Sequence, residues 1–299
     1  MRVLIAIPHF VRGESASRPQ AKDCGIQRRH GSLDARVEHR VEALTACLAS
    51  LRLHFHDAHV CIEQRTATAR PTPAQGPVTV SVIVCTTGGQ HALDRLPAEV
   101  RYFTHKNHDV EPELLGFTCH DVLRENLGQF DYYGFLEDDL TLVDPWFFQK
   151  LAWFNALAGD DKLLQPNRFE AGLGRLISKV YVDGALAERV TDMFQNIHDS
   201  PPLTLNALGQ DVPFERTLNP HSGCFFLNAR QMAHWVRQPH FNDRQSRFIG
   251  PLETTASLGI MRAFRVYKPA PACADFLEVQ HHGTGYLDQL CAPEQENRP

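Results

Sequence analysis

Three consecutive carboxylates, Glu137, Asp138 and Asp139, directly follow the apolar residues 132–136, which we expect to form a buried strand. Such a cluster repels itself and cannot be buried without compensation. A divalent cation supplies that compensation, because hard oxygen ligands suit Mg²⁺ or Mn²⁺. Ligands of open α/β sheets also gather at the carboxyl ends of strands. The position of the cluster therefore favours a metal site over the alternative, a solvated acidic turn that caps the next helix.

Residues 136–140, together with residues 144–148, resemble the acidic motif and following helix of GT-A-fold glycosyltransferases. The Glu-Asp-Asp form is similar to that of the N-acetylglucosaminyltransferase I type. The resemblance implies that Asp139 binds Mn²⁺ or Mg²⁺, which bridges the diphosphate of a nucleotide-sugar. It also implies that Glu137 and Asp138 hold the ribose of the nucleotide or water molecules on the metal.

Two histidines, His281 and His282, follow a predicted late strand at residues 276–279. In the family, a histidine near the C-terminus often supplies another metal ligand, so the resemblance implies this role for one of the two. Consecutive residues at a strand end face opposite ways, so the sequence does not decide which histidine faces the metal. The alternative is an exposed pair in a turn that contains Gly283 and Gly285.

A turn at residues 219–223 leads into an apolar strand and places Gly223 at its start. This segment resembles the acceptor-side strand of the same fold, in which a glycine lets a sugar approach the backbone. An ordinary turn is the alternative.

Glu253 lies at the start of a predicted helix, where the resemblance implies a catalytic base. Thr254 replaces the second acid of the Glu-Asp pair that the family usually carries there. The alternative is ordinary helix-start chemistry, because an acidic side chain is favoured in the first turn of a helix. If Glu253 is not the base, Asp211 or Glu215 is the next residue to test.

Pro8, His9 and Phe10 end the first predicted strand, where the family contacts the nucleotide base. Three arginines in the loop that follows could reach the diphosphate as bidentate donors, or could form a solvated loop. They are Arg12, Arg28 and Arg29. Residues 165–168 follow another strand, and the sequence gives no reason to choose a role for them.

Hydrophobic periodicity indicates the elements that must position these residues. Strands are predicted at residues 3–7, 78–84, 100–104, 132–136, 163–166, 224–227, 265–268 and 276–279. Helices are predicted at residues 36–53, 114–127, 229–237 and 251–263, with another that starts at Asp144 and Pro145. Residues 11–35, 65–77 and 183–217 are predicted loops. The order predicts one α/β domain over residues 1–299, with a mostly parallel sheet flanked by helices. Residues 1–140 would bind the nucleotide-sugar and residues 141–299 the acceptor.

Composition excludes several other classes of protein. The 299 residues carry a net charge of −5, which argues against a nucleic-acid partner, and no run approaches the length of a transmembrane segment. The start does not resemble a signal peptide, so a cytoplasmic location is expected. Eight cysteines without a CxxC pair predict reduced, mostly buried thiols. Phosphate-binding loops of the GxxxxGK[ST] type, complete GxGxxG motifs and GxSxG elbows are absent.

The sequence therefore predicts a metal-dependent transferase that moves a sugar from a nucleoside-diphosphate sugar, with UDP favoured as the nucleotide, to a glycan or small-molecule hydroxyl. Two alternatives stay open. One is a nucleotidyltransferase that makes sugar nucleotides, and the other is a non-catalytic nucleotide- or sugar-binding protein of the same fold.

Overall fold

The central element of the computed structural model is a five-stranded sheet in the order β13-β6-β1-β4-β5. The model describes residues 1–11, 37–56, 58–72, 78–172, 175–244 and 248–291. Three of the four strand pairs are parallel, and β13 is antiparallel to β6. The strands are β1 (Arg2–Pro8), β4 (Thr79–Thr87), β5 (Thr104–His108), β6 (Tyr132–Leu136) and β13 (Cys224–Asn228). The predicted mixed, mostly parallel α/β sheet is confirmed.

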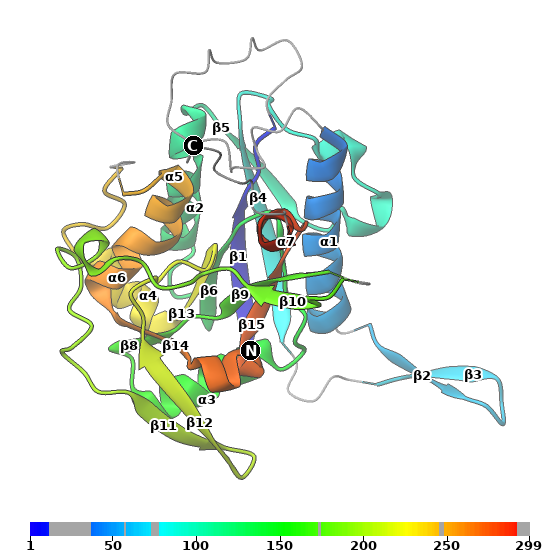
Figure 1. Ribbon diagram of the computed structural model, residues 1–299. Helices are drawn as coiled ribbons and strands as arrows, with labels where there is room; N and C mark the ends of the chain where they lie inside the picture. Colours follow the sequence, from blue (N-terminus) through cyan, green and yellow to red (C-terminus); the bar gives the residue numbers. More distant parts are fainter. Residues whose placement is uncertain (12–36, 57, 73–77, 173–174, 245–247, 292–299) are drawn as a thin grey trace, which may run out of the picture.

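Helices cover both faces of this sheet. Val3, Ile5 and Ile7 of β1 pack in the same core cluster as the apolar residues of α1 (Val37–Phe55). Leu4 and Ala6 point the other way, toward α2 (Leu115–Glu125). This alternation follows from the two-residue period of a strand. Figure 1 accordingly shows α1 and α2 on opposite sides of β1 and β4.

Two smaller sheets extend the fold. One has the order β10-β9-β15-β7 and contains β7 (Leu140–Thr141), β9 (Asn167–Ala171), β10 (Lys179–Tyr181) and β15 (Glu278–His281). The other has the order β11-β12-β14-β8 and contains β8 (Lys162–Leu164), β11 (Leu203–Ala207), β12 (Gln210–Arg216) and β14 (Arg265–Pro269). In the first of these sheets His281 pairs with Leu140, directly after the acidic triplet.

The remaining helices lie mainly in the second half of the chain. They are α3 (Phe147–Ala158), α4 (Ala229–Val236), α5 (Pro251–Glu253), α6 (Gly259–Ala263) and α7 (Gly285–Cys291). A π-helical turn, Thr254–Leu258, joins α5 to α6, so the predicted helix over residues 251–263 is continuous. Short 3₁₀ turns occur at Leu93–Arg95, Ala98–Val100, Pro112–Leu114, Glu188–Val190 and Pro271–Phe276.

Several predicted boundaries were wrong. The strand predicted at residues 100–104 begins only at Thr104, because residues 98–100 form a 3₁₀ turn. β5 is an edge strand of polar residues, so no apolar run marks it. Helix α3 begins at Phe147 rather than at Pro145, and Asp144 Oδ1 instead accepts a hydrogen bond from the Trp146 N–H at 2.8 Å. The late strand begins at Glu278 rather than at residue 276.

Two predicted loops contain hairpins. Residues 65–77 include β3 (Thr68–Pro71), which pairs with β2 (Val60–Glu63) and projects from the body of the protein (Figure 1). Residues 183–217 include the hairpin of β11 and β12. Its turn has positive φ at Leu208 as well as at Gly209 (51° and 79°). A leucine is unusual at such a φ, so the sequence carries a weak turn signal there.

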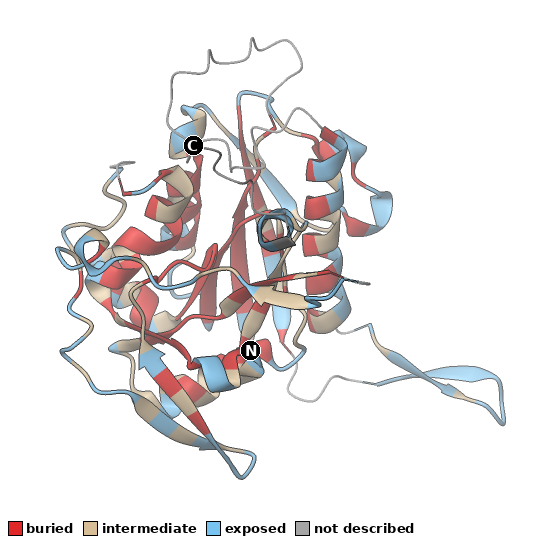
Figure 2. Ribbon diagram, viewed as in Figure 1, coloured by how far each residue is buried: buried red, intermediate tan, exposed pale blue. Residues whose placement is uncertain are grey.

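Burial follows this architecture (Figure 2). Every residue of β6 is buried, whereas the β2–β3 hairpin is exposed almost throughout. Four free cysteines are buried as predicted, and Cys61 on the hairpin is an exposed exception; the buried ones are Cys47, Cys85, Cys119 and Cys224. Among the described residues, no helix is long and apolar enough to cross a bilayer.

Candidate functional site

The acidic triplet forms a turn at the carboxyl end of β6, between the end of β1 and the start of β13. Glu137 and Asp138 are buried, and the Asp139 side chain is about one-fifth exposed. Because β6 is an inner strand of the sheet, the turn is enclosed by its neighbours, and its charges require partners within the protein.

Asp138 is held through both of its carboxylate oxygens. His9 Nδ1 lies 2.5 Å from Asp138 Oδ2, and Arg40 Nη2 donates to Asp138 Oδ1. The other ring nitrogen of His9 accepts from the Ala92 N–H at 3.2 Å, so Nδ1 carries the proton that is donated to Asp138. Burial opposes ionisation of Asp138, but Arg40 and His9 more than offset it and hold its pKa below the ordinary value.

Arg40 is a site residue that sequence reasoning missed. It comes from the first turns of α1 and is 6% exposed. Its Nη1 also lies 3.3 Å from Asp139 Oδ2, so one guanidinium bridges two adjacent carboxylates. The available signal was an arginine on the face of α1 that also carries Val37 and Leu44, both buried. A charged side chain in that position needs a buried partner.

Asp139 faces both Arg40 and His281. His281 Nε2 lies 3.9 Å from Asp139 Oδ2. Asp139 Oδ1 is buried and has no hydrogen-bond partner among the described residues. Buried carboxylate oxygens normally have a partner, so Oδ1 is available to a ligand.

His281 is oriented by Glu170, which is fully buried. Glu170 Oε1 lies 3.0 Å from His281 Nδ1, while Oε2 accepts from the Tyr286 and Leu287 N–H groups at the start of α7 (2.9 and 2.8 Å). Because the carboxylate accepts from Nδ1, the lone pair of His281 is on Nε2, which faces Asp139. A carboxylate behind a histidine is typical of metal-ligating histidines.

His282 contributes differently. Its backbone N–H donates to the Asp139 carbonyl oxygen at 2.8 Å. Its side chain is partly buried, and burial lowers the pKa of the ring although Asp139 opposes this. Of the two predicted histidines, His281 is therefore the one whose ring nitrogen lies within 4 Å of the Asp139 carboxylate.

Glu137 packs against Gly223, the glycine singled out in the sequence. The Glu137 N–H donates to the Gly223 carbonyl oxygen at 2.9 Å. Arg168 Nη1 lies 3.8 Å from Glu137 Oε2, and Oε1 is buried without a partner among the described residues. Burial raises the pKa of Glu137 well above its ordinary value, and the charge of Asp139 raises it further, while Arg168 partly offsets both.

Arg168 belongs to a buried charge network behind Glu137. It donates to Asp183 Oδ1 through Nη2 (2.8 Å) and Nε (3.2 Å), and Lys268 Nζ lies 3.5 Å from Asp183 Oδ2. Lys268 also donates to the His221 carbonyl oxygen at 2.6 Å. The segment 165–168, for which the sequence suggested no role, therefore contributes a cation that faces the acidic turn.

Glu253 also lies near this turn. It ends the short helix α5, and its charge is one of those that raise the pKa of Glu137, after burial and Asp139. Glu253 Oε2 is buried without a hydrogen-bond partner among the described residues. The two substitutes, Asp211 and Glu215, are exposed on β12, in a different sheet from β6, and not in a loop as predicted.

The three residues predicted to contact the nucleotide base differ in their surroundings. Pro8 ends β1, His9 is fully buried against Asp138, and Phe10 packs half-buried against the core cluster on the α2 side. The arginines proposed for the diphosphate lie outside the described residues; they are Arg12, Arg28 and Arg29.

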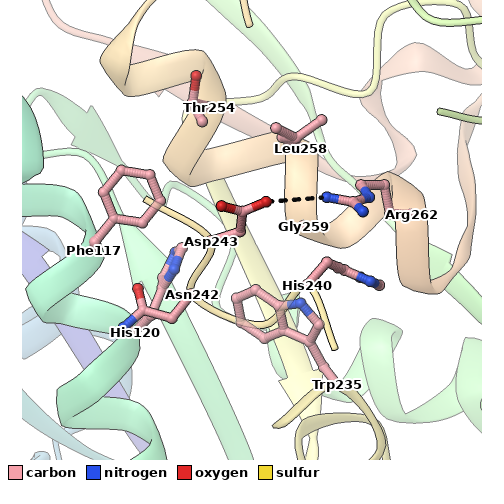
Figure 3. Close-up of a pocket in the computed structure, with 10 residues that line it drawn as sticks. All are labelled: Phe117, His120, Trp235, His240, Asn242, Asp243, Thr254, Leu258, Gly259 and Arg262. Carbon is pink, nitrogen blue, oxygen red and sulfur yellow. Dashed lines mark ion pairs between the residues drawn. The ribbon is translucent and has the colours of Figure 1, made fainter. Parts of the chain in front are cut away.

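A separate small pocket lies among α2, α4 and the 251–263 helical segment (Figure 3). His120, Trp235 and Asn242 line it, and Figure 3 marks the ion pair of Arg262 with Asp243, 3.7 Å between Nη1 and Oδ2. Its volume of about 10 Å³ is close to what one water molecule needs, so it is too small for a nucleotide.

No family model matches the sequence, and no curated protein matches it. Among solved structures, S. aureus TarS 1-349 aligns with a TM-score of 0.44 and 9% identity, over 95% of this chain and 61% of that one. The same protein in complex with UDP-GlcNAc aligns with a TM-score of 0.40 and 10% identity, over 95% of this chain and 59% of that one. This protein thus spans about three fifths of the TarS chains in those structures.

Two further structures show a weaker likeness. Mouse xyloside xylosyltransferase 1 aligns with a TM-score of 0.39 and 11% identity, over 89% of this chain and 85% of that one. The galactosyltransferase LgtC, in complex with donor and acceptor sugar analogs, aligns with a TM-score of 0.38 and 9% identity, over 94% of this chain and 87% of that one. Because the TM-scores of these four structures are below 0.5, the alignments carry no conclusion about function, which has to be argued from the site.

Proposed function

We propose that this protein transfers a sugar from a nucleoside-diphosphate sugar, specifically a UDP-sugar, to a hydroxyl group of a glycan or small-molecule acceptor. The observation that carries the proposal is the approach of His281 to Asp139, at 3.9 Å, at the carboxyl end of an inner strand. Segments that the sequence singled out separately for donor, metal and acceptor meet at this turn. They supply His9, Glu137 and Gly223, and the charge of Glu253 acts on Glu137.

A divalent cation fits this site if the protein and the donor both supply ligands to it. Among the described residues, no three histidine, cysteine, aspartate or glutamate side chains form a group that could hold a metal by themselves. Asp139, with one unpartnered oxygen, and His281, with its Nε2 lone pair, supply two ligands. The oxygens of a diphosphate and water would complete the shell, as is common for Mg²⁺ sites. We therefore propose that Mn²⁺ or Mg²⁺ binds together with the donor.

The surrounding residues have distinct proposed roles. When bound, the cation stabilises the negative charge that develops on the leaving diphosphate. Asp138 has both oxygens engaged by His9 and Arg40, so it orients the turn rather than contacting the ribose. Glu137 keeps Oε1 available for a hydroxyl of the donor. If the reaction inverts configuration, Glu253 takes the proton of the acceptor hydroxyl.

Calorimetric titration with UDP and with GDP, each with and without Mn²⁺, tests the donor and the metal together. We expect UDP to bind at least about tenfold more tightly with Mn²⁺, and this gain to disappear in Asp139→Ala. Asp94→Ala, a change at an exposed aspartate, is the matched control. Absence of nucleotide binding under all conditions would contradict the proposal.

Product analysis separates the remaining alternatives. Release of UDP from a UDP-sugar supports glycosyl transfer, whereas release of pyrophosphate identifies a nucleotidyltransferase. Nucleotide binding without turnover on any donor and acceptor identifies a non-catalytic binding protein. The expected cytoplasmic location stays a prediction.

A further inference from the structure

A cavity of about 250 Å³ opens at the segment that begins with the 3₁₀ turn Glu188–Val190. Thr191, Gln195 and Leu218 are among the residues that line it. A water molecule occupies about 30 Å³ of liquid, and pockets for drug-sized ligands start near 300 Å³. The cavity is therefore sized for one small ring rather than for a single water molecule or a whole nucleotide.

Gln195 carries an unsatisfied acceptor at the wall of this cavity. Gln195 is one of the lining residues, and it is 8% exposed. Gln195 Nε2 donates to the Thr217 carbonyl oxygen at 3.0 Å, and since a carbonyl can only accept, the amide orientation is fixed. Oε1 is consequently an acceptor, and it is buried without a partner in the described part of the chain. Such an atom lacks the donor that a buried acceptor normally has.

The other polar lining groups make the cavity rich in acceptors. Glu188 and Asp192 are exposed carboxylates on its wall. Asn196 is also exposed, and its Oδ1 accepts from the His198 N–H at 2.9 Å, which leaves its Nδ2 as a donor. Two negative charges repel an anionic ligand, whereas carboxylate and amide oxygens suit a ligand with several hydroxyl groups.

Two connections link the residues around the cavity to the acidic turn. Leu218 lies five residues before Gly223, so the two are at most about 18 Å apart. On the other side, Asn219 Nδ2 donates to the Gly184 carbonyl oxygen at 3.0 Å, next to Asp183, which is paired with Arg168. Leu218 and Asn219 therefore connect one wall of the cavity to the segments that carry Gly223 and Arg168.

We propose that this cavity is an acceptor subsite that binds an uncharged saccharide ring, with Gln195 as the residue that recognises a ring hydroxyl. The assignment as part of the acceptor rests on the proposed function. Binding of an uncharged sugar, and rejection of an anionic one, follow from the lining alone.

Saturation-transfer NMR on the full chain tests this site directly. The probes are the methyl β-glycosides of glucose, galactose and N-acetylglucosamine, with methyl β-glucuronide as an anionic probe of the same ring size. We expect transfer to at least one uncharged probe and about tenfold weaker binding of the glucuronide. Transfer to none of the uncharged probes, or equal binding of the glucuronide and the glucoside, would overturn the proposal.

Two variants locate the binding. Gln195→Met keeps the side-chain length but removes the Oε1 acceptor together with the Nε2 donor to Thr217, and we expect about tenfold weaker binding of the uncharged probe. Asp192→Asn changes an exposed residue, so folding is not at risk. The difference in affinity between the uncharged probe and the glucuronide should become smaller in this variant. Gln129→Met, at an exposed glutamine, is the control and should bind as the wild type does. Unchanged binding in both cavity variants would place the sugar elsewhere and overturn the proposal.

Titration of UDP with Mn²⁺ in the same samples separates this inference from the proposed function. Nucleotide binding without saccharide binding overturns the subsite and leaves the transferase proposal intact. Saccharide binding that depends on Gln195, without nucleotide binding, supports the subsite and contradicts the proposed donor.

Discussion

Gly223 lies so close to Glu137 that a Cβ atom added to Gly223 would be 2.7 Å from Glu137 Oε2. Gly223 also has a φ of +65°, a conformation that side chains other than glycine rarely adopt. Two features predicted independently, an acidic turn and a glycine before an apolar strand, are therefore parts of one contact. The glycine is required there by its own backbone and by the carboxylate beside it.

Gly223→Ala should reduce stability by more than φ strain alone, because the new methyl group displaces Glu137. The matched control is Gly209→Ala, since Gly209 has a φ of +79° and open space around its Cβ position. We expect the free energy of unfolding to fall by about 1 kcal/mol in the control and by more in Gly223→Ala. Gly223→Ala should also bind UDP more weakly. Urea unfolding and calorimetry measure both; equal losses in the two variants would mean that the contact with Glu137 is unimportant.

Much of this site could be predicted from sequence because its residues follow apolar runs. The acidic triplet was found from β6, a five-residue strand buried throughout, and Gly223 from its position before β13. Arg40 and Glu170 were missed because each lies within an element, on a helix or a strand, far in sequence from the carboxylate or histidine it contacts. A single sequence shows strand ends but not which distant side chain fills the space beside them.

His281→Gln should weaken Mn²⁺-dependent binding of UDP, because it removes the Nε2 lone pair that faces Asp139. Glu170→Gln should do so to a smaller extent, about 10-fold, since it perturbs only the orientation of the ring. His282→Gln is the control, as its contact with Asp139 is through the backbone. Titration of Mn²⁺ into the UDP complex measures the effect. A larger loss in His282→Gln than in His281→Gln would assign the ligand to His282.

Arg40→Met should destabilise the protein by about 3 kcal/mol, because it leaves the buried carboxylate of Asp138 without its cation. Adding Asp138→Asn should recover part of the loss, since the residual charge is then removed as well. Arg52→Met, at an exposed arginine of the same helix, should change stability little. Urea unfolding of the wild type, Arg40→Met, Asp138→Asn and the double variant gives the coupling energy, and strictly additive effects would contradict the pairing.

Glu253→Gln should lower kcat by about 100-fold or more while UDP binding stays unchanged, as expected for the loss of a general base. Glu215→Gln, at an exposed position on β12, is the control. Steady-state kinetics with a transferred sugar, together with calorimetry, provide the two measurements. If kcat is unaffected in Glu253→Gln, the reaction needs no base at this position, as in an enzyme that retains configuration.

His120 makes stability depend on pH away from the acidic turn. It is buried among aromatic rings, with the Trp235 ring centroid at 4.9 Å, and its Nε2 is bonded to the Thr255 carbonyl oxygen at 3.0 Å. Burial lowers the pKa of His120 from 6.5 to about 4, although Thr255 and Asp121 oppose the shift. Between these two values the unfolded chain binds more protons than the folded chain does, so acid favours unfolding.

The stabilisation from a neutral His120 should therefore be complete above about pH 6.5 and be lost as the pH falls toward 4, by about 3 kcal/mol. His120→Phe has no proton to gain, so it should lose correspondingly less stability than the wild type over this range. His234→Phe, at an exposed histidine, should follow the wild type. Urea unfolding at pH 7 and pH 4.5 makes the comparison. Equal acid sensitivity in wild type and His120→Phe would mean that other groups account for the loss.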